Sequence, residues 1–542
     1  MKIKIKKLAI LATSLVVLGT GCKTNFDINA STEDLTAGSL NYRDVLPAAL
    51  SNNARIVATD WKFLQNWMGY WARSGSYQND QQEETYNFTN SFPSTNNPWT
   101  DLYYNNSSYN YVQTKAIESG SGFYEAIARI MKAHNFQLLT DVYGNIPYSE
   151  ALKGNEVRSP KYDKGADIYK DLFRELDKAI ALLKDPVASS PANNDKITTN
   201  DLVFKGNASM WIKFANTLKL RLLVHAYDVP EINAAAEVAI IEAEGSGYLQ
   251  SGETAKINPG YSSAKPNPFY RAYAINENGV LASNADFVKA NSYAAGFGNV
   301  SNPGNWGYYR YDADPRIDKF YVKPDVNPDA AIYEPADYHK GIPFGATSGQ
   351  FPNSLGPDLS SINAINSTSP NTGLTPNGPA SDAWIITSVE SLFLQAEARE
   401  RGIINSGPSA KDLLYSAVLE SFTTLGLTTQ DYEDYLDYNI GFPDVDYDEA
   451  TDKTYTILSQ KWFALNGIAP YEIWTDVRRT DIVYGDLVGF DPGPPLSILT
   501  GAKPSIPIRL FYPQSEYSFN EVNAKAQGTI DVFTSRIFWD KQ

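Results

Sequence analysis

The sequence predicts a mainly α-helical protein in which paired helices form a scaffold beside a loop-rich half. Two observations predict this fold class. Several segments carry apolar residues at the three-and-four spacing of one helical face. Between them lie two long regions, residues 250–345 and 341–382, that are rich in Gly, Pro and Asn and show little periodicity. The helical segments come in pairs, so we expect stacked helical hairpins.

The helical segments share an apolar stripe, and several end at Gly or are followed by Pro, as helices commonly do. They are residues 123–144, 168–185, 209–227, 388–403 and 409–427. Long irregular segments in folded proteins are usually functional or disordered. We expect the first irregular region, in this aromatic-rich chain, to be functional and the second to be surface loop.

The N-terminus carries the features of an export signal. Residues 1–21 have four lysines among the first seven residues, then an apolar run too short to span a bilayer, and then small residues. Cys22, the only cysteine, follows "LGTG" directly, as in a bacterial lipoprotein signal. We therefore predict lipidation of Cys22 and a flexible tether over residues 22–40. The alternative is an ordinary secretory signal with an incidental cysteine.

The composition fits a folded protein with a substantial core and sets one class of partner aside. Hydrophobic residues make up 43% of the chain and charged residues 20%. Lys and Arg number 46 against 62 Asp and Glu, a net charge of −16, and no basic run is present. Nucleic-acid binding depends on neutralising phosphates, so that class is excluded.

Few residue patterns point to catalysis or to a cofactor. The chain has three histidines, and it contains no H-E-x-x-H, P-loop or G-x-S-x-G motif. The acidic stretch from Asp444 to Asp452 resembles the start of a calcium loop. It has Glu449 where the loop needs glycine and Tyr455 where it needs a bidentate glutamate. We expect no metal or cofactor, and leave calcium open as the minor alternative.

Aromatic residues set among polar ones provide the candidate binding site. A sugar ring offers a flat C–H face and a rim of hydroxyls, which match an aromatic plate flanked by amides, carboxylates and guanidinium groups. The alternative is that such rings only pin loops onto the core, as we expect for Trp211, Trp462 and Trp474 in apolar helical patterns. The candidate ligand-binding residues are Trp67, Trp71, Tyr77, Trp99, Trp306 and Tyr308.

Several segments, in order along the mature chain, resemble the SusD/RagB family of nutrient-binding outer-membrane lipoproteins, in particular its divergent SusD-like branch. The clearest is "ARIMKAHNFQLLTDVYGNIPYSEAL" at residues 128–152, a helix leading into a "YGxxPY" turn. The others are "DADPRIDKFY" at 312, "YHKGIPFG" at 338, "SVESLFLQAEARERG" at 388, "QKWFALNGIAPYEIWTDVRRTD" at 460 and "PIRLFYPQSEYSFNEVN" at 507.

The resemblance implies one SusD-like domain over residues 41–542, with tetratricopeptide-like hairpins, an aromatic ligand site on the loop-rich face and no catalysis. It implies an outer-membrane protein, lipid-anchored and facing the cell exterior, that binds oligosaccharides from polysaccharide breakdown. It would act as the lid of a SusC-like TonB-dependent barrel in nutrient uptake. Three alternatives remain: a peptide-binding lid, a surface endo-glycosidase and a purely structural lipoprotein.

Overall fold

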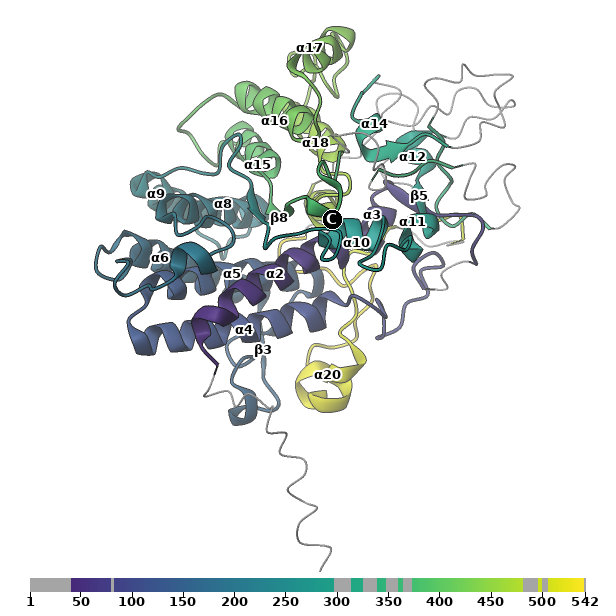
Figure 1. The fold of residues 1–542 in the computed structure, drawn as a ribbon. Helices are drawn as coiled ribbons and strands as arrows, with labels where there is room; N and C mark the ends of the chain where they lie inside the picture. The colour runs from purple at the N-terminus through teal and green to yellow at the C-terminus, as the bar shows by residue number, and fades with distance from the viewer. Residues whose placement is uncertain are drawn as a thin grey trace, which may run out of the picture.

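Long helices form one half of the molecule, and short strands, short helices and loops form the other (Figure 1). The computed structural model describes residues 40–78, 82–296, 313–324, 339–347, 359–363, 373–480, 496–499 and 505–540. The mainly helical prediction is confirmed. In the part of the chain that is described, no helix is both long and apolar enough to cross a membrane.

The helical half is built from long helices that pack side by side. They are α2 (Tyr42–Thr59), α4 (Pro98–Ser119), α5 (Gly122–Tyr143), α6 (Gly165–Lys184), α8 (Ala208–Ala226), α9 (Ala234–Glu244), α15 (Ser388–Glu400), α16 (Ala410–Thr424), α17 (Thr429–Tyr438), α18 (Lys453–Ala464) and α19 (Pro470–Arg479). All five helical segments predicted from periodicity are among them, as α5, α6, α8, α15 and α16.

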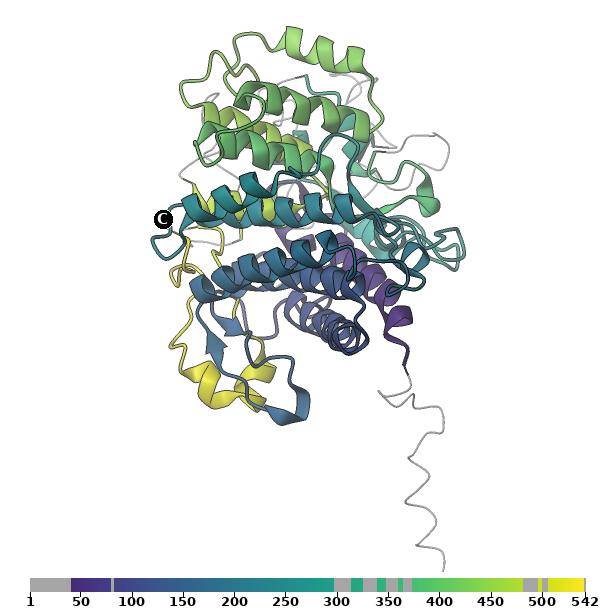
Figure 2. The ribbon, with the colours of Figure 1, turned by 90° about the vertical axis from the view of Figure 1, so that its left-hand side faces the viewer.

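The helices stack in layers that follow the chain, with one long interruption (Figure 2). α4 packs on α5, α5 on α6, α6 on α8, α8 on α15, and α15 on α16 and α18. α8 and α15 are neighbours in space, although residues 227–387 separate them in sequence. Much of the loop-rich half is therefore a single insertion between adjacent scaffold helices.

The α4–α5 hairpin shows how local sequence sets the scaffold. The Asn97 side-chain oxygen accepts hydrogen bonds from the backbone N–H groups of Trp99 (3.0 Å) and Thr100 (3.4 Å), which caps α4. Gly120, with φ of +66°, ends α4 in the left-handed conformation that glycine adopts without strain. α5 then begins two residues later and runs back along α4, with most of its residues buried.

The loop-rich half contains small antiparallel sheets. The largest has the strand order β1-β5-β7-β6, with β1 (Trp71–Arg73), β5 (Val288–Ala290), β7 (Ser361–Ile362) and β6 (Tyr321–Val322). The pair of β4 (Ala255–Ile257) with β8 (Ala383–Ile386) is separate from this sheet, and the pair of β2 (Ile146–Pro147) with β3 (Tyr162–Asp163) lies beside the helical half, after α5. The short helices are α3 (Lys62–Trp67), α7 (Ile197–Asn200), α10 (Pro268–Tyr273), α11 (Ser283–Phe287), α12 (Ser292–Ala295), α14 (Ile317–Phe320), α20 (Gln514–Phe519) and α21 (Glu521–Lys525).

The prediction that the second irregular region is surface loop is wrong for the residues that are described. Strand β7 lies inside the four-stranded sheet, and Ile342 and Phe344 are buried. The turn-forming composition of this region was compatible with a short buried strand, because a strand of two residues carries no periodicity to detect.

A buried network of charged side chains joins five scaffold helices, α5, α8, α15, α18 and α19. Each acidic member lies within 4.0 Å of a basic member, and the side chains are almost fully removed from solvent. Buried charges are tolerated when they are paired in this way. The members are Asp141, Arg221, His225, Glu390, Glu397, Lys461, Glu472, Asp476 and Arg479.

Candidate functional site

Three of the predicted ligand-binding tryptophans are core residues. Trp67, Trp71 and Trp99 are 0%, 1% and 5% exposed. None of them offers a free ring face to a ligand, so their assignment to a sugar site is wrong. The expectation that Trp211, Trp462 and Trp474 are core residues is confirmed.

Trp67 lies in an aromatic cluster that joins α3 to α19. Its ring lies 5.0 Å from that of Phe63, 6.1 Å from that of Phe92 in a stacked arrangement, and 6.2 Å from that of Trp474. Trp67 and Trp71 do not share a helical face, because α3 ends at Trp67 and β1 begins at Trp71. Between them Gly69, with φ of +77°, turns the chain.

Trp99 holds the first hairpin to the C-terminal segment. Its ring meets those of Tyr103 at 5.0 Å, Tyr143 at 4.9 Å and Tyr512 at 5.9 Å. These contacts connect α4, the end of α5 and the chain near residue 512. Trp99 therefore stabilises the scaffold and does not take part in a binding face.

Tyr77 is the one predicted residue that the structure shows at the surface, with 36% of its area exposed. Its hydroxyl donates to Asp286 Oδ2 at 2.6 Å, and its ring packs 5.2 Å from that of Phe287. Both partners belong to α11. Trp306 and Tyr308 lie outside the described residues, so their assignment stays a prediction.

A groove of about 700 Å³ lies where α2 meets the loop-rich half, and we call it the α2–α10 groove. Its volume falls within the range of small-molecule sites. One wall comes from the C-terminal half of α2, and the other comes from α10, the start of α11 and the segments around them. α10 packs on α2 and on α11, and all three helices are labelled in Figure 1. The polar and aromatic side chains that line it are Ser51, Arg55, Thr59, Asn96, Tyr261, Lys265, Arg271, Asn276, Glu277, Ser283 and Asn284.

Trp71 packs against α10, the helix that forms part of the groove wall. Its ring packs edge-on against Tyr273 at 5.0 Å and Phe269 at 6.2 Å, both of which belong to α10. The start of α10 is fixed by Asn267, whose side-chain oxygen accepts the N–H groups of Phe269 and Tyr270 at 2.8 and 3.1 Å. The buried aromatic cluster thus presents the outer face of α10, with Arg271, to the groove.

Arg55 gives the α2 wall a fixed positive charge. Its guanidinium contacts Asp60 Oδ1 and Asp101 Oδ2, each at 3.0 Å, and its Nε donates to Asn52 at 3.0 Å. Burial, opposed by Arg55 and helped by a hydrogen bond with Asp101, raises the pKa of Asp60 to about 7. The two carboxyl groups share the guanidinium and hold it in place at the groove.

The opposite wall combines an exposed ion pair with a ring. Arg271 makes two hydrogen bonds to Glu277, at 2.6 and 2.8 Å, in the forked geometry typical of arginine and carboxylate. Tyr261 lines the same groove. Ser283 and Asn284 extend it along α11, the helix that also binds Tyr77. The groove therefore offers guanidinium, amide, hydroxyl and carboxylate groups beside one tyrosine ring.

Arg55, Tyr261 and Arg271 line the groove but were not among the residues predicted from the sequence. Arg55 sits in an ordinary amphipathic helix, so nothing in its neighbourhood marked it. Tyr261 and Arg271 fall inside residues 250–345, the irregular region that we expected to be functional. The composition of residues 250–345 indicated a functional region. Which of its residues line the groove depends on how α10 packs against α2.

The acidic stretch from Asp444 to Asp452, considered as a calcium loop, uses its carboxylates in contacts within the protein. Asp446 accepts hydrogen bonds from the N–H groups of Gly441 and Asp448, and the Asp448 carboxylate pairs with Lys411. Over the described part of the chain, no group of three or more His, Cys, Asp or Glu is arranged to hold a metal ion.

The fold defines a class of protein. The structure is similar to a chitin-binding SusD homologue from Flavobacterium johnsoniae, with a TM-score of 0.70 and 22% identity over 93% of this chain and 99% of that chain. It is also similar to a SusD-like protein from Bacteroides thetaiotaomicron, with a TM-score of 0.69 and 20% identity over 92% and 99% of the two chains. At these identities the likeness establishes the fold.

The family follows from the sequence. The SusD-like family model described as "Starch-binding associating with outer membrane" matches residues 43–513. The chain belongs to this SusD-like family, as its motifs predicted. No curated protein sequence matches it.

Proposed function

We propose that this protein binds oligosaccharides at the outer-membrane surface, with the α2–α10 groove as a principal contact. The observation that carries the proposal is the chemistry of that groove. Arg55, Arg271 and Asn276 can hydrogen-bond hydroxyl groups, and Tyr261 supplies a ring beside them. Membership of a family described as starch-binding supports a glycan ligand, as does the fold shared with a chitin-binding homologue.

The wider role follows the family's association with the outer membrane. We propose that Cys22 carries the lipid anchor, that the domain faces the cell exterior, and that it closes over a SusC-like TonB-dependent barrel. Ligand would be delivered unchanged, because capture needs binding and no bond cleavage. Incubation with bound oligosaccharides should therefore leave their chain length unchanged in chromatography, and shortened products would contradict a purely binding role.

The groove is tested by calorimetry with malto-oligosaccharides, chito-oligosaccharides and a peptide pool. Arg271 is more than half exposed, so Arg271→Ala should leave folding intact. We expect it to weaken oligosaccharide binding about tenfold, the equivalent of one hydrogen bond to a charged group of ~1.5 kcal/mol.

Arg174→Ala is the matched control. Arg174 is an exposed arginine of α6, ion-paired like Arg271 but outside the groove, and its removal should not change affinity. Equal affinities of all three proteins for the oligosaccharide would rule the groove out. Binding of peptides in preference to both sugars would replace the glycan ligand with a peptide.

Trp306 is tested separately, since the sequence alone nominates it. Trp306→Ala should weaken oligosaccharide binding at least several-fold while the melting temperature stays unchanged. An unchanged affinity would remove Trp306 from the site.

A further inference from the structure

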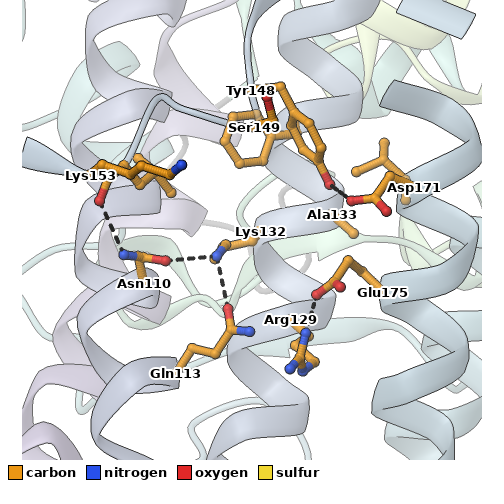
Figure 3. Close-up of a pocket in the computed structure, with 13 residues that line it drawn as sticks. Asn110, Gln113, Arg129, Lys132, Ala133, Tyr148, Ser149, Lys153, Asp171 and Glu175 are labelled. Carbon is orange, nitrogen blue, oxygen red and sulfur yellow. Dashed lines mark hydrogen bonds and ion pairs between the residues drawn. The ribbon is translucent and has the colours of Figure 1, made fainter. Parts of the chain in front are cut away.

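A second cavity, of about 300 Å³, lies within the helical half, between α4, α5, α6 and the segment of residues 148–153 (Figure 3). We call it the α4–α6 pocket. It lies apart from the α2–α10 groove, with which it shares no lining residue. Lys132 of α5 lies at its centre, next to Asn110 and Gln113 of α4 in Figure 3.

Lys132 is a largely buried cation without an anionic partner. Its Nζ donates to Asn110 Oδ1 at 2.9 Å and to Gln113 Oε1 at 2.8 Å. Every residue from α4 to α6 is described, and within this part of the chain no carboxylate lies within 4.0 Å of Nζ. An ammonium has three donors, so one N–H remains available to a molecule in the pocket.

The nearby carboxylates are already engaged. Glu175 is held by Arg129 and by Lys178, the latter at 2.7 Å. Asp171 accepts from the Tyr148 hydroxyl at 2.8 Å and pairs with Arg174 at 3.3 Å. Both carboxylates therefore already have cationic partners, and neither lies within 4.0 Å of Lys132 Nζ.

Burial lowers the pKa of Lys132 to about 8, because the charged form is poorly solvated, and the attraction of Glu175 offsets only part of this effect. A bound carboxylate would compensate the charge directly. It would make the charge-assisted hydrogen bond that the protein leaves unmade.

The other residues that line the pocket indicate which chemical groups the rest of the ligand would carry. The rings of Phe136 and Tyr148 stand perpendicular, 4.8 Å apart, and give the pocket an apolar wall. The Gln113 amide nitrogen makes no hydrogen bond within the described part of the chain and can donate to a hydroxyl, and the Asn110 amide lies nearby. Such a lining suits a compact molecule that has a C–H face, several hydroxyls and one carboxylate.

We propose that the α4–α6 pocket binds a sugar acid of monosaccharide size, with its carboxylate on Lys132 and its hydroxyls on the Asn110 and Gln113 amides. This site is independent of the groove and of the proposed function, so either can fail without the other. It would allow the protein to respond to acidic sugars separately from the oligosaccharide that it captures.

The test is calorimetry on the full-length protein in detergent, with D-glucuronate, D-glucose and acetate as probes. D-glucuronate should bind saturably, and D-glucose and acetate at least about tenfold more weakly, because each lacks half of the recognised chemistry. Lys132→Met should abolish the binding. Lys115→Met is the matched control, because Lys115 is a solvent-exposed α4 lysine paired with Glu118, and it should bind like the wild type.

Gln113→Glu keeps the test decisive if Lys132→Met does not fold. It replaces the amide oxygen beside Nζ with a carboxylate, so it should raise the melting temperature and at the same time abolish binding of D-glucuronate. The proposal is overturned by any of three results: no saturable binding of D-glucuronate, equal binding of D-glucose, or unchanged D-glucuronate affinity in Lys132→Met or Gln113→Glu.

Discussion

At the scale of single residues, the polar neighbours of a tryptophan did not indicate whether its ring is exposed. Gln65 and Asn66 flank Trp67 in sequence, yet both are buried. Gln65 Oε1 accepts the backbone N–H of Gly467 at 3.1 Å, and the Asn66 amide donates to Glu83. Buried amides that hydrogen-bond to other protein groups are common in protein interiors. A polar sequence context therefore indicated a polar partner, which here is the protein itself.

Trp67→Ala should lower the free energy of unfolding by ~3–5 kcal/mol, because it opens a cavity in a closed aromatic cluster. Denaturant unfolding monitored by circular dichroism measures the change. Tyr77→Ala is the exposed counterpart, and we expect it to cost about 1 kcal/mol or less. A Trp67→Ala protein that unfolds like the wild type but no longer binds oligosaccharide would contradict the assignment of Trp67 to the core.

At the scale of elements, the motifs that revealed the family are largely structural. The segments at 128, 388 and 460 form α5, α15, α18 and α19, and they supply most of the buried charged network. Within it, His225 Nδ1 lies 3.2 Å from Asp141 Oδ2, and Nε2 lies 3.2 Å from Glu472 Oε2. A carboxylate only accepts hydrogen bonds, so both nitrogens donate, which requires the imidazolium form.

Two buried histidines should shift stability in opposite directions with pH. Burial opposes the charged form of His225, but Glu472 and Asp141 overcome this and raise its pKa above 6.5. Its stabilising effect is present below pH 6.5 and is lost as the pH rises through the raised value. Burial, reinforced by Arg221, lowers the pKa of His134 to about 3. The unfolded chain then binds the extra proton, so stability is lost as the pH falls from 6.5 towards 3.

Both effects are measured by chemical denaturation of the wild type, His225→Gln and His134→Gln at a series of pH values below and above 6.5. The difference in free energy of unfolding between His134→Gln and the wild type should change by ~1.4 kcal/mol per pH unit between pH 6 and 4. The His225→Gln difference should change only above pH 6.5. Parallel curves for all three proteins would contradict both assignments.

At the scale of the whole molecule, the α2–α10 groove exists because a long insertion folds back onto the first scaffold helix. α2 contacts α4 and α5 of the scaffold, and on its other side it contacts α10, β4 and β8 of the loop-rich half. The α2–α10 groove lies at this junction. A layer of packed helices therefore supports a face built from loops, and loops tolerate sequence change better than the elements they connect.

Cys22→Ser tests the proposed anchor. Without the thiol no lipid can be attached, so the variant should lose the palmitate label and its retention in the outer-membrane fraction. Fractionation and metabolic labelling with palmitate measure this, with Lys23→Ser as the neighbouring control. A Cys22→Ser protein that stays in the membrane and still carries label would rule out lipidation at this residue.

The sequence by itself determined α5, α6, α8, α15 and α16, because each of them carries its own apolar stripe. Local caps fix the ends of other helices, as Asn97 and Gly120 do for α4. The sequence also determined the family, because the network-forming segments are continuous in sequence. Only the tertiary structure decided that Trp67, Trp71 and Trp99 are buried and which polar groups face a cavity. Trp71 and Arg271 reach their places through the packing of α10 on α2, two elements more than two hundred residues apart. Contacts over such separations leave no periodic pattern in the sequence, because periodicity reports only the faces of single elements.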